Sequence, residues 1–335
     1  MHYMNRWIQL FVAVLATCGL HAVVLAQASA PKALARTVNA VVGIKTIAVK
    51  GARSAETLGM LREGSGILID AEGHVLTVGY LLIEADSVML ETDAGLKVPA
   101  AVVAYDQASG FGLLKAIAPL KIEPALIGSS AALGASEPVI TVSGGDEGSV
   151  SEAQVVSKRP FAGYWEYLLD EALFTAPARA DHSGAALVNS AGELVGIGSL
   201  FVQNAAADNA RMQGNMFIPI DLLKPILSEL KTQGASKASA RPWLGLSSQE
   251  MDGRLRVIRV SKASPAEQAG VEVGDLVLAI NGTKIDTLKS FYQELWKSPS
   301  AETDVLLTVL KGTELRQLKI QAKDRTSFMI KPTGI

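Results

Sequence analysis

The sequence is short of the residues that build disulfides, thiolate metal sites and large aromatic surfaces. Cys18 is the single cysteine among 335 residues, so the chain cannot form an internal disulfide. Aromatic residues make up 5% of the chain, and the net charge is −2 with no long run of either sign. This charge balance argues against a nucleic-acid-binding surface, so we expect no nucleic-acid partner. We also expect no cofactor.

Histidine, a common general base and metal ligand, is scarce as well. Two of the four histidines fall in the N-terminal apolar segment, which leaves His74 and His182. A metal site built on either of them, with Glu72 and Asp181 as further ligands, is the weaker alternative because no ligand spacing recurs. We therefore expect no metal.

The N-terminal residues have the pattern of an export signal. Arg6 precedes an apolar run from Trp7 to Ala26, and Ala26-Gln27-Ala28 fits a signal-peptidase site. We predict a signal peptide over residues 1–28 and a periplasmic location. An uncleaved inner-membrane anchor is the alternative, because the run is near the length that spans a bilayer. A lipoprotein signal at Cys18 is weaker, since the apolar run continues past it.

What the chain does have is apolar sequence, 49% of its residues, mostly in short runs separated by turn residues. From Val38 to Gly198 these runs predict an antiparallel barrel or sandwich, with hairpin turns at residues 70–73 and 92–95. The period then changes, and residues 218–234 predict a helix with Asp221 as its N-cap and Gly234 as its end. Its apolar face comprises Leu222, Leu223, Ile226, Leu227 and Leu230.

A second module follows the small-residue segment 234–240, which we expect to be a linker of the flexible kind. Strand patterns there surround two predicted helices, one at SPAEQAG and one over Thr287–Lys297. The pair Asn281-Gly282 predicts a tight turn between them. The chain therefore has two folding modules.

Several segments resemble, in order and spacing, the HtrA/Deg family of trypsin-like proteases. The matching segments are GSGILIDAEGHVLT, VVAYD, HSGAALVNSAGELVGI, FIPIDLLKPILSEL, PWLGL and ASPAEQAGVEVGDLVLAINGTKI. The resemblance implies a mainly β protein, with a trypsin-like double β-barrel over residues 31–233 and the linker at 234–240. An α+β PDZ domain over residues 241–325 and a tail over residues 326–335 would follow.

The resemblance also implies a peptide-binding groove in the second module. PDZ domains add a peptide strand between a helix and the strand that follows a carboxylate-binding loop. Backbone N–H groups of that loop would hold a terminal carboxylate, and Gly245 allows a close backbone approach. Apolar helix residues would line the groove or, alternatively, only fill the core. The predicted groove residues are Trp243, Leu244, Gly245, Leu246, Leu288, Phe291 and Leu295.

Only the nucleophile of the family's catalytic triad is retained. Ser183 occupies its position, whereas Tyr80 stands where the family has histidine and Gly110 where it has aspartate. A phenol with a pKa near 10 is a poor base at neutral pH. His182 is also a poor base, because neighbouring side chains in an extended segment or tight turn point apart. In the oxyanion loop, Asp181 replaces a glycine, which adds negative charge where an oxyanion would form.

These losses predict an inactive HtrA-like envelope protein, a pseudoprotease. Its PDZ domain would bind protein C-termini or unfolded polypeptides in a scaffold, chaperone or regulatory role in protein quality control. The alternative is an active serine endopeptidase in which Ser183 uses a non-standard base, His74 or His182. A homotrimer and co-assembly with an active paralogue both follow from the resemblance. The sequence leaves the clients, the preferred peptide and the oligomeric state open.

Overall fold

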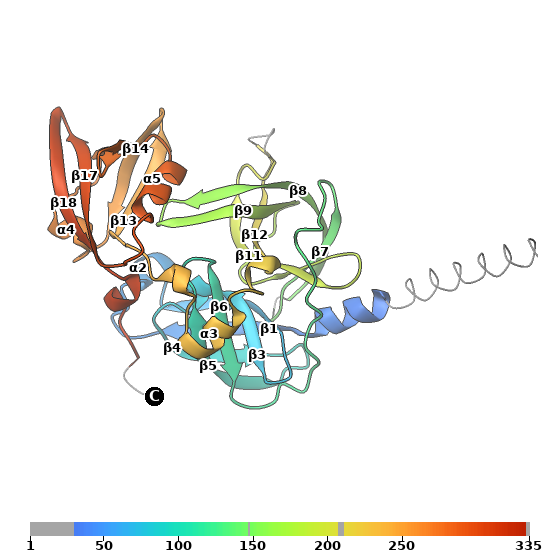
Figure 1. Ribbon diagram of the computed structural model, residues 1–335. Helices are drawn as coiled ribbons and strands as arrows, with labels where there is room; N and C mark the ends of the chain where they lie inside the picture. The colour runs from blue at the N-terminus through green and yellow to red at the C-terminus, as the bar shows by residue number, and fades with distance from the viewer. Residues whose placement is uncertain (1–29, 147, 207–210, 333–335) are drawn as a thin grey trace, which may run out of the picture.

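The computed structural model describes residues 30–146, 148–206 and 211–332. A helix at residues 30–39 leads into two antiparallel barrels, and a smaller sheet domain follows (Figure 1). The predicted signal peptide and Cys18 lie outside the described residues. Among the residues that are described, no helix is long and apolar enough to cross a membrane.

The first barrel is closed in the strand order β1-β2-β3-β6-β5-β4. The predicted turns at residues 70–73 and 92–95 are confirmed: the first joins β2 to β3, the second β4 to β5. The short helices α2 and η1 follow β1 and β3. The bounds are β1 Val41–Ala48, α2 Ala55–Leu58, β2 Leu61–Leu68, β3 His74–Val78, η1 Gly79–Leu81, β4 Ala85–Glu91, β5 Lys97–Tyr105 and β6 Phe111–Ala116.

The second barrel repeats this plan in the order β10-β11-β12-β9-β8-β7. Its β8–β9 hairpin extends beyond the barrel and reaches the C-terminal domain (Figure 1). One apolar core joins the two barrels, with Ile44 and Leu76 from the first and Ile197 and Met216 from the second. The bounds are β7 Pro138–Val142, β8 Val150–Gly163, β9 Tyr167–Ala176, β10 Ala186–Val188, β11 Leu194–Val202 and β12 Gly214–Pro219.

The C-terminal domain is a sheet in the order β13-β14-β15-β17-β18, with β16 paired to β15. In β17, buried Val305, Leu307 and Val309 alternate with more exposed residues, as expected for a strand with one face on the core. The predicted turn at Asn281-Gly282 joins β15 to β16. The bounds are β13 Leu246–Met251, β14 Arg254–Val260, α4 Pro265–Gln268, β15 Leu276–Ile280, β16 Thr283–Lys284, α5 Leu288–Leu295, β17 Thr303–Lys311, β18 Glu314–Ala322 and η4 Arg325–Phe328.

The helix predicted over residues 218–234 is wrong in its first half. The chain forms a short η2 (Ile220–Leu222) and then α3 (Leu227–Gln233), because Pro225 disfavours a continuous helix. Asp221 does not cap α3. Its carboxylate instead accepts hydrogen bonds from Ser129, Ser130 and the backbone of Ala131. Leu222 is accordingly 37% exposed, whereas Gly234 ends the helix as predicted.

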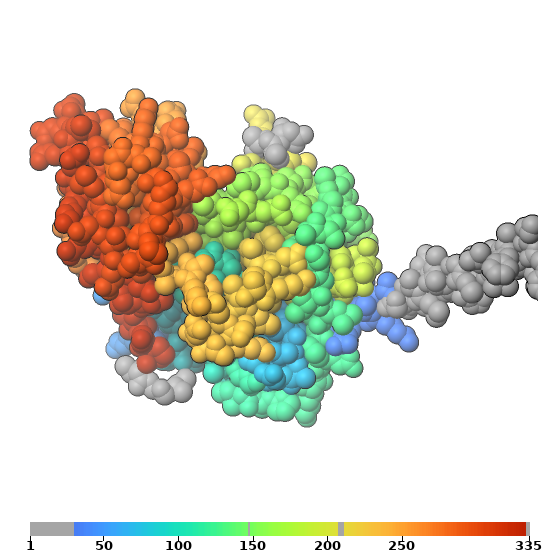
Figure 2. Space-filling view, viewed as in Figure 1, coloured from blue at the N-terminus to red at the C-terminus, as the bar shows by residue number. Residues whose placement is uncertain are grey.

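The segment 234–240 differs from the flexible linker that its composition suggests. It contains a 3-10 turn, η3 (Lys237–Ser239), that the buried carboxylate of Asp106 holds to the first barrel. Asp106 accepts from the Ser236 backbone N–H at 2.8 Å and from Ser239 Oγ at 2.6 Å. It also accepts from the backbone and the hydroxyl of Ser109. Figure 2 shows the orange and red C-terminal domain resting against this amber segment and the green hairpin.

We predict that Asp106→Ala destabilises the protein by about 2–4 kcal/mol, because four donors lose their partner. Burial favours the neutral acid, but the hydrogen bonds from Ser109, Ser236 and Ser239 outweigh it and lower the pKa of Asp106. A lowered folded-state pKa stabilises the fold above the unfolded pKa of about 3.9. The difference in the free energy of unfolding between wild type and Asp106→Ala should therefore be constant from pH 5 to 7 and shrink below about pH 4.

Denaturant unfolding at each pH measures this difference. The control is Asp86→Ala, an exposed aspartate on β4, which should change stability by less than about 0.5 kcal/mol. A cost for Asp106→Ala equal to that of the control would show that the linker is not held by this carboxylate.

Candidate functional site

The loop that carries Ser183 is fastened to both barrels. The backbone N–H of Ser65, on β2, donates to the Ser183 carbonyl at 2.8 Å. The Gly184 N–H donates to the Gly198 carbonyl on β11, also at 2.8 Å. These contacts hold Ser183 where the two barrels meet, the place at which the resemblance expects a nucleophile.

Tyr80 lies directly against Ser183. It is carried by η1, just after β3, and its hydroxyl oxygen is 2.7 Å from Ser183 Oγ and 2.9 Å from the Ser199 carbonyl oxygen. Burial raises the pKa of Tyr80 to about 12, and the hydrogen bond to Ser183 opposes this shift only in part. The phenol therefore keeps its proton at neutral pH and cannot take the proton of the serine.

Both histidines outside the N-terminal segment bond elsewhere. His74 Nδ1 is 2.7 Å from Asp70 Oδ2, and His182 Nδ1 is 3.0 Å from the Arg179 carbonyl oxygen. Across residues 30–146, 148–206 and 211–332, the side chain hydrogen-bonded to Ser183 Oγ is Tyr80. The arrangement thus has the spacing of a nucleophile–base pair without a group that can act as the base.

Another tyrosine lies against Gly110, the position at which the resemblance expects the triad aspartate. Gly110 lies next to η1, because the Gly79 N–H donates to its carbonyl at 2.7 Å. A Cβ at Gly110 would lie 2.5 Å from the hydroxyl oxygen of Tyr167, and its φ of +85° also disfavours other residues. The Tyr167 hydroxyl donates to the Ser109 carbonyl at 2.7 Å. An aspartate would not fit here.

Asp181 stands where the resemblance expects the oxyanion-loop glycine, and its carboxylate is fully hydrogen-bonded. It pairs with Arg179, with one nitrogen–oxygen contact at 2.9 Å, and accepts from the hydroxyls of Ser143 and Ser149. Burial raises its pKa, yet the bonds from Arg179 and Ser143 outweigh burial and hold the pKa far below its ordinary value. Asp181 stays charged at neutral pH, and the guanidinium of Arg179 in the same loop balances its charge.

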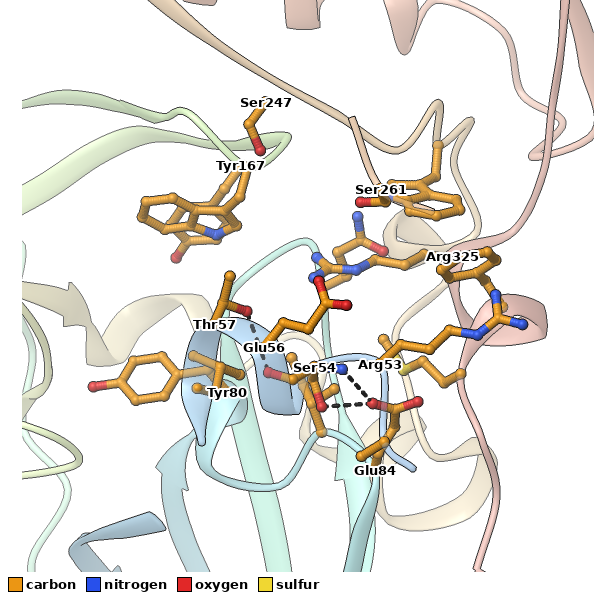
Figure 3. Close-up of a pocket in the computed structure, with 18 of the residues that line it drawn as sticks. Arg53, Ser54, Glu56, Thr57, Tyr80, Glu84, Tyr167, Ser247, Ser261 and Arg325 are labelled. Atoms are coloured by element: carbon orange, nitrogen blue, oxygen red, sulfur yellow. Dashed lines mark hydrogen bonds between the residues drawn. The ribbon is translucent and has the colours of Figure 1, made fainter. Parts of the chain in front are cut away.

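A pocket of about 610 Å³ lies among the two barrels and the C-terminal domain. Tyr80 and Tyr167 line it, whereas Ser183 does not. Figure 3 shows the Tyr80 phenol pointing away from the charged group formed by Arg53 and Glu84. Tyr80 thus contacts both this pocket and Ser183, whereas Ser183 does not line the pocket.

Within the described residues, one group has the composition of a metal site. Its ligand atoms, from Asp70, Glu72 and His74, all lie within 4.8 Å of one another. Lys231 Nζ lies 2.7 Å from Asp70 Oδ2 and 3.6 Å from Glu72 Oε2. The Lys231 ammonium therefore lies beside these two carboxylates and balances part of their negative charge.

Two family models match the chain. The model described as "Trypsin-like peptidase domain" matches residues 64–197, and the model described as "PDZ domain" matches residues 242–322. A probable periplasmic serine endoprotease DegP-like from Pseudomonas fluorescens is 28% identical over 295 residues, 81% of this chain and 59% of that protein. The serine endoprotease DegS of Haemophilus influenzae is 26% identical over 268 residues, 77% of this chain and 76% of that protein.

These matches support a trypsin-like peptidase domain of the HtrA/Deg type followed by a PDZ domain. The chain spans only 55–59% of the length of the first two curated relatives. The fold agrees with solved structures. The HtrA-type protease AlgW with a decapeptide superposes with a TM-score of 0.53 at 19% identity, over 91% of this chain and 99% of that one. The serine endoprotease from Yersinia pestis superposes with a TM-score of 0.53 at 21% identity, over 88% of this chain and 98% of that one. The predicted mainly β fold is confirmed.

The carboxylate loop of this PDZ domain already holds a carboxylate. The backbone N–H groups of Leu244 and Leu246 donate to Glu166 at 3.1 Å, and that of Gly245 donates at 2.7 Å. Gly245 has a φ of +81°, and a Cβ there would lie 2.3 Å from Ser264 Cβ. Glu166 is 1% exposed, and burial raises its pKa to about 7. The hydrogen bonds from the three N–H groups lower this pKa but do not cancel the effect of burial.

The predicted groove residues lie together in the PDZ domain and are all buried. On α5, Leu288, Phe291 and Leu295 belong to the apolar core of this domain, together with Leu244 and Leu246. Trp243 packs on Phe328, with ring centroids 4.6 Å apart. The structure therefore places these residues around one loop, and their role toward a peptide stays a prediction.

Sequence reasoning missed two residues of the site, Tyr167 and Glu166. Both belong to the sequence Gly163-Tyr164-Trp165-Glu166-Tyr167, which joins β8 to β9. The only local signal is a cluster of three aromatic residues in a chain that is poor in them. Nothing in the local sequence indicates that Glu166 accepts a hydrogen bond from the backbone of Gly245, 79 residues away.

We predict that Gly110→Asp, which restores the family's acid, destabilises the protein by about 2–4 kcal/mol and restores no activity. The new side chain collides with Tyr167 and forces an unfavourable φ. The matched control is Gly95→Asp, where φ is +78° and nothing lies within 4 Å, so only the backbone cost of about 1 kcal/mol remains.

Thermal or denaturant unfolding of the two variants measures the difference. Adding Tyr167→Phe to Gly110→Asp should recover part of the loss, and the double-mutant cycle gives the coupling. Equal costs for Gly110→Asp and Gly95→Asp would mean that Tyr167 does not fill the place of the acid.

Proposed function

We propose that this HtrA/Deg-family chain is a pseudoprotease of the bacterial envelope that binds polypeptides through its PDZ domain. It would take protein C-termini or unfolded segments and act as a scaffold, chaperone or regulator in protein quality control. The observation that carries the proposal is the hydrogen bond between Ser183 and Tyr80, a group that is protonated at neutral pH.

The energetics support an inactive site. In a serine protease, loss of the acid costs about 10⁴ in turnover, and loss of the base or nucleophile about 10⁶. Here the base position holds a phenol with a pKa of about 12, and the acid position has no side chain. Deprotonating Ser183 would need a base that the surroundings of its Oγ do not offer.

Two kinds of observation support peptide binding and the location. A PDZ domain is present, and its carboxylate loop has three N–H groups directed at a carboxylate. Among the structural neighbours, AlgW was solved with a decapeptide and with a tripeptide. Relatives are named periplasmic, which agrees with the predicted export signal. A homotrimer and co-assembly with an active paralogue are further parts of the proposal, by analogy of fold.

The alternative function is an active endopeptidase that uses Ser183. One observation favours it: backbone hydrogen bonds fasten the Ser183 loop to both barrels, where the resemblance expects a nucleophile. It needs a base to replace Tyr80, and His74 and His182 are both bonded to other groups.

We predict that the mature protein is not labelled by a fluorophosphonate probe and does not degrade casein. Both measurements are compared with Ser183→Ala, which should be indistinguishable from wild type, and with an active trypsin-like protease as the positive control. Labelling of wild type that is lost in Ser183→Ala would overturn the inactive site. The proposed peptide binding is measured separately, as described below.

A further inference from the structure

The tip of the β8–β9 hairpin lies in the PDZ groove. Ser248, on the strand after the carboxylate loop, donates its backbone N–H to the Tyr164 carbonyl at 3.1 Å. On the other side, the hydroxyl of Tyr292 on α5 donates to the Gly163 carbonyl at 2.6 Å and accepts from the Glu166 N–H at 3.1 Å. The tip thus bonds both to the strand and to the helix that border the groove.

The chemical groups of the tip reproduce those of a bound C-terminus. Glu166 gives both carboxylate oxygens to the loop N–H groups, Oε1 to Gly245 and Leu246 and Oε2 to Leu244. Beside it, Ala162 and Leu168 pack on the apolar core of the PDZ domain, where an apolar peptide side chain would lie. A carboxylate in a backbone nest with apolar neighbours is how these domains recognise a chain end.

The backbone at Glu166 is held in an uncommon conformation. Its φ is +61°, a value that glutamate adopts rarely and at a cost. The side chain is removed from water although it is ionisable, which adds a desolvation cost. A positive φ is common at the last residue of a three-residue hairpin loop such as the one between Gly163 and Tyr167. The three N–H bonds offset the desolvation cost and hold the tip against the PDZ loop.

We propose that Glu166 is an internal ligand of the PDZ carboxylate loop, and that a protein C-terminus binds the groove only by displacing the β8–β9 tip. The displacement step rests on the proposed peptide-binding function. The binding energy of a C-terminus is then reduced by the energy that undocks the tip, which lowers its apparent affinity.

The first test measures the internal ligand without any peptide. In the mature full chain, amide hydrogen exchange of Leu244, Gly245 and Leu246 is compared between wild type and Glu166→Ala. We expect exchange at least tenfold faster in the variant. The Trp243 amide, which donates to the Lys323 carbonyl instead, should be unchanged. Asp170→Ala, an exposed acid on the same hairpin, should behave as wild type. Equal loop exchange in Glu166→Ala and wild type overturns the inference.

The second test adds a peptide probe, a fluorescein-labelled decapeptide pool with free C-termini and randomised last four positions. We expect at least tenfold tighter binding to Glu166→Ala than to wild type or Asp170→Ala, and no binding of the same pool with amidated ends. Binding to wild type as tight as to Glu166→Ala overturns the displacement step and leaves the peptide-binding function in place. No binding to any variant, with the loop amides exposed in Glu166→Ala, overturns the proposed peptide-binding function itself.

A second variant keeps both tests decisive if Glu166→Ala does not fold. Tyr292→Phe removes the hydroxyl that bonds Gly163 and Glu166 but leaves the carboxylate loop intact. Tyr292→Phe should speed amide exchange in the carboxylate loop and tighten peptide binding, as Glu166→Ala does, but by smaller factors. If Tyr292→Phe folds and leaves both quantities at their wild-type values, the tip is not what closes the groove.

Discussion

The relative placement of the domains depends on a carboxylate from one domain that is bonded by the backbone of the other. Glu166 is 1% exposed, and three consecutive backbone N–H groups of the PDZ loop donate to its carboxylate. An ionised group that is buried this deeply would be costly without such partners. The second barrel and the PDZ domain are therefore coupled, and Asp106 adds a second buried carboxylate that holds the linker to the first barrel.

The surroundings of Ser183 are packed as a unit. Tyr80 bonds to Ser183, and a Cβ at Gly110 would lie 2.5 Å from the Tyr167 hydroxyl oxygen. Tyr167 is buried and Tyr80 is partly buried, and both are hydrogen-bonded and protonated at neutral pH. Ser183 thus lies among side chains that hold their protons, and a larger side chain at Gly110 would have to move a packed neighbour.

Much of the fold is predictable because its signals are local. The hairpin turns at residues 70–73 and 92–95 and the capped helix α5 each depend on residues within a few positions of one another. The helix over residues 218–234 was predicted too long, since its apolar spacing continues across Pro225 and hides the break. The linker was predicted to be flexible because its small residues carry no sign of the distant carboxylate that binds them.

The sequence by itself determined the domain order and the positions of Ser183, Tyr80 and Gly110, because motifs of fixed spacing flank each of them. It also determined which backbone loop would hold a carboxylate. Only the tertiary structure decided what occupies these places. Tyr167 bonds to a residue 58 positions away and Glu166 to one 79 positions away. Such contacts arise from the closure of the barrels and the reach of one hairpin, and no local pattern of residues encodes them.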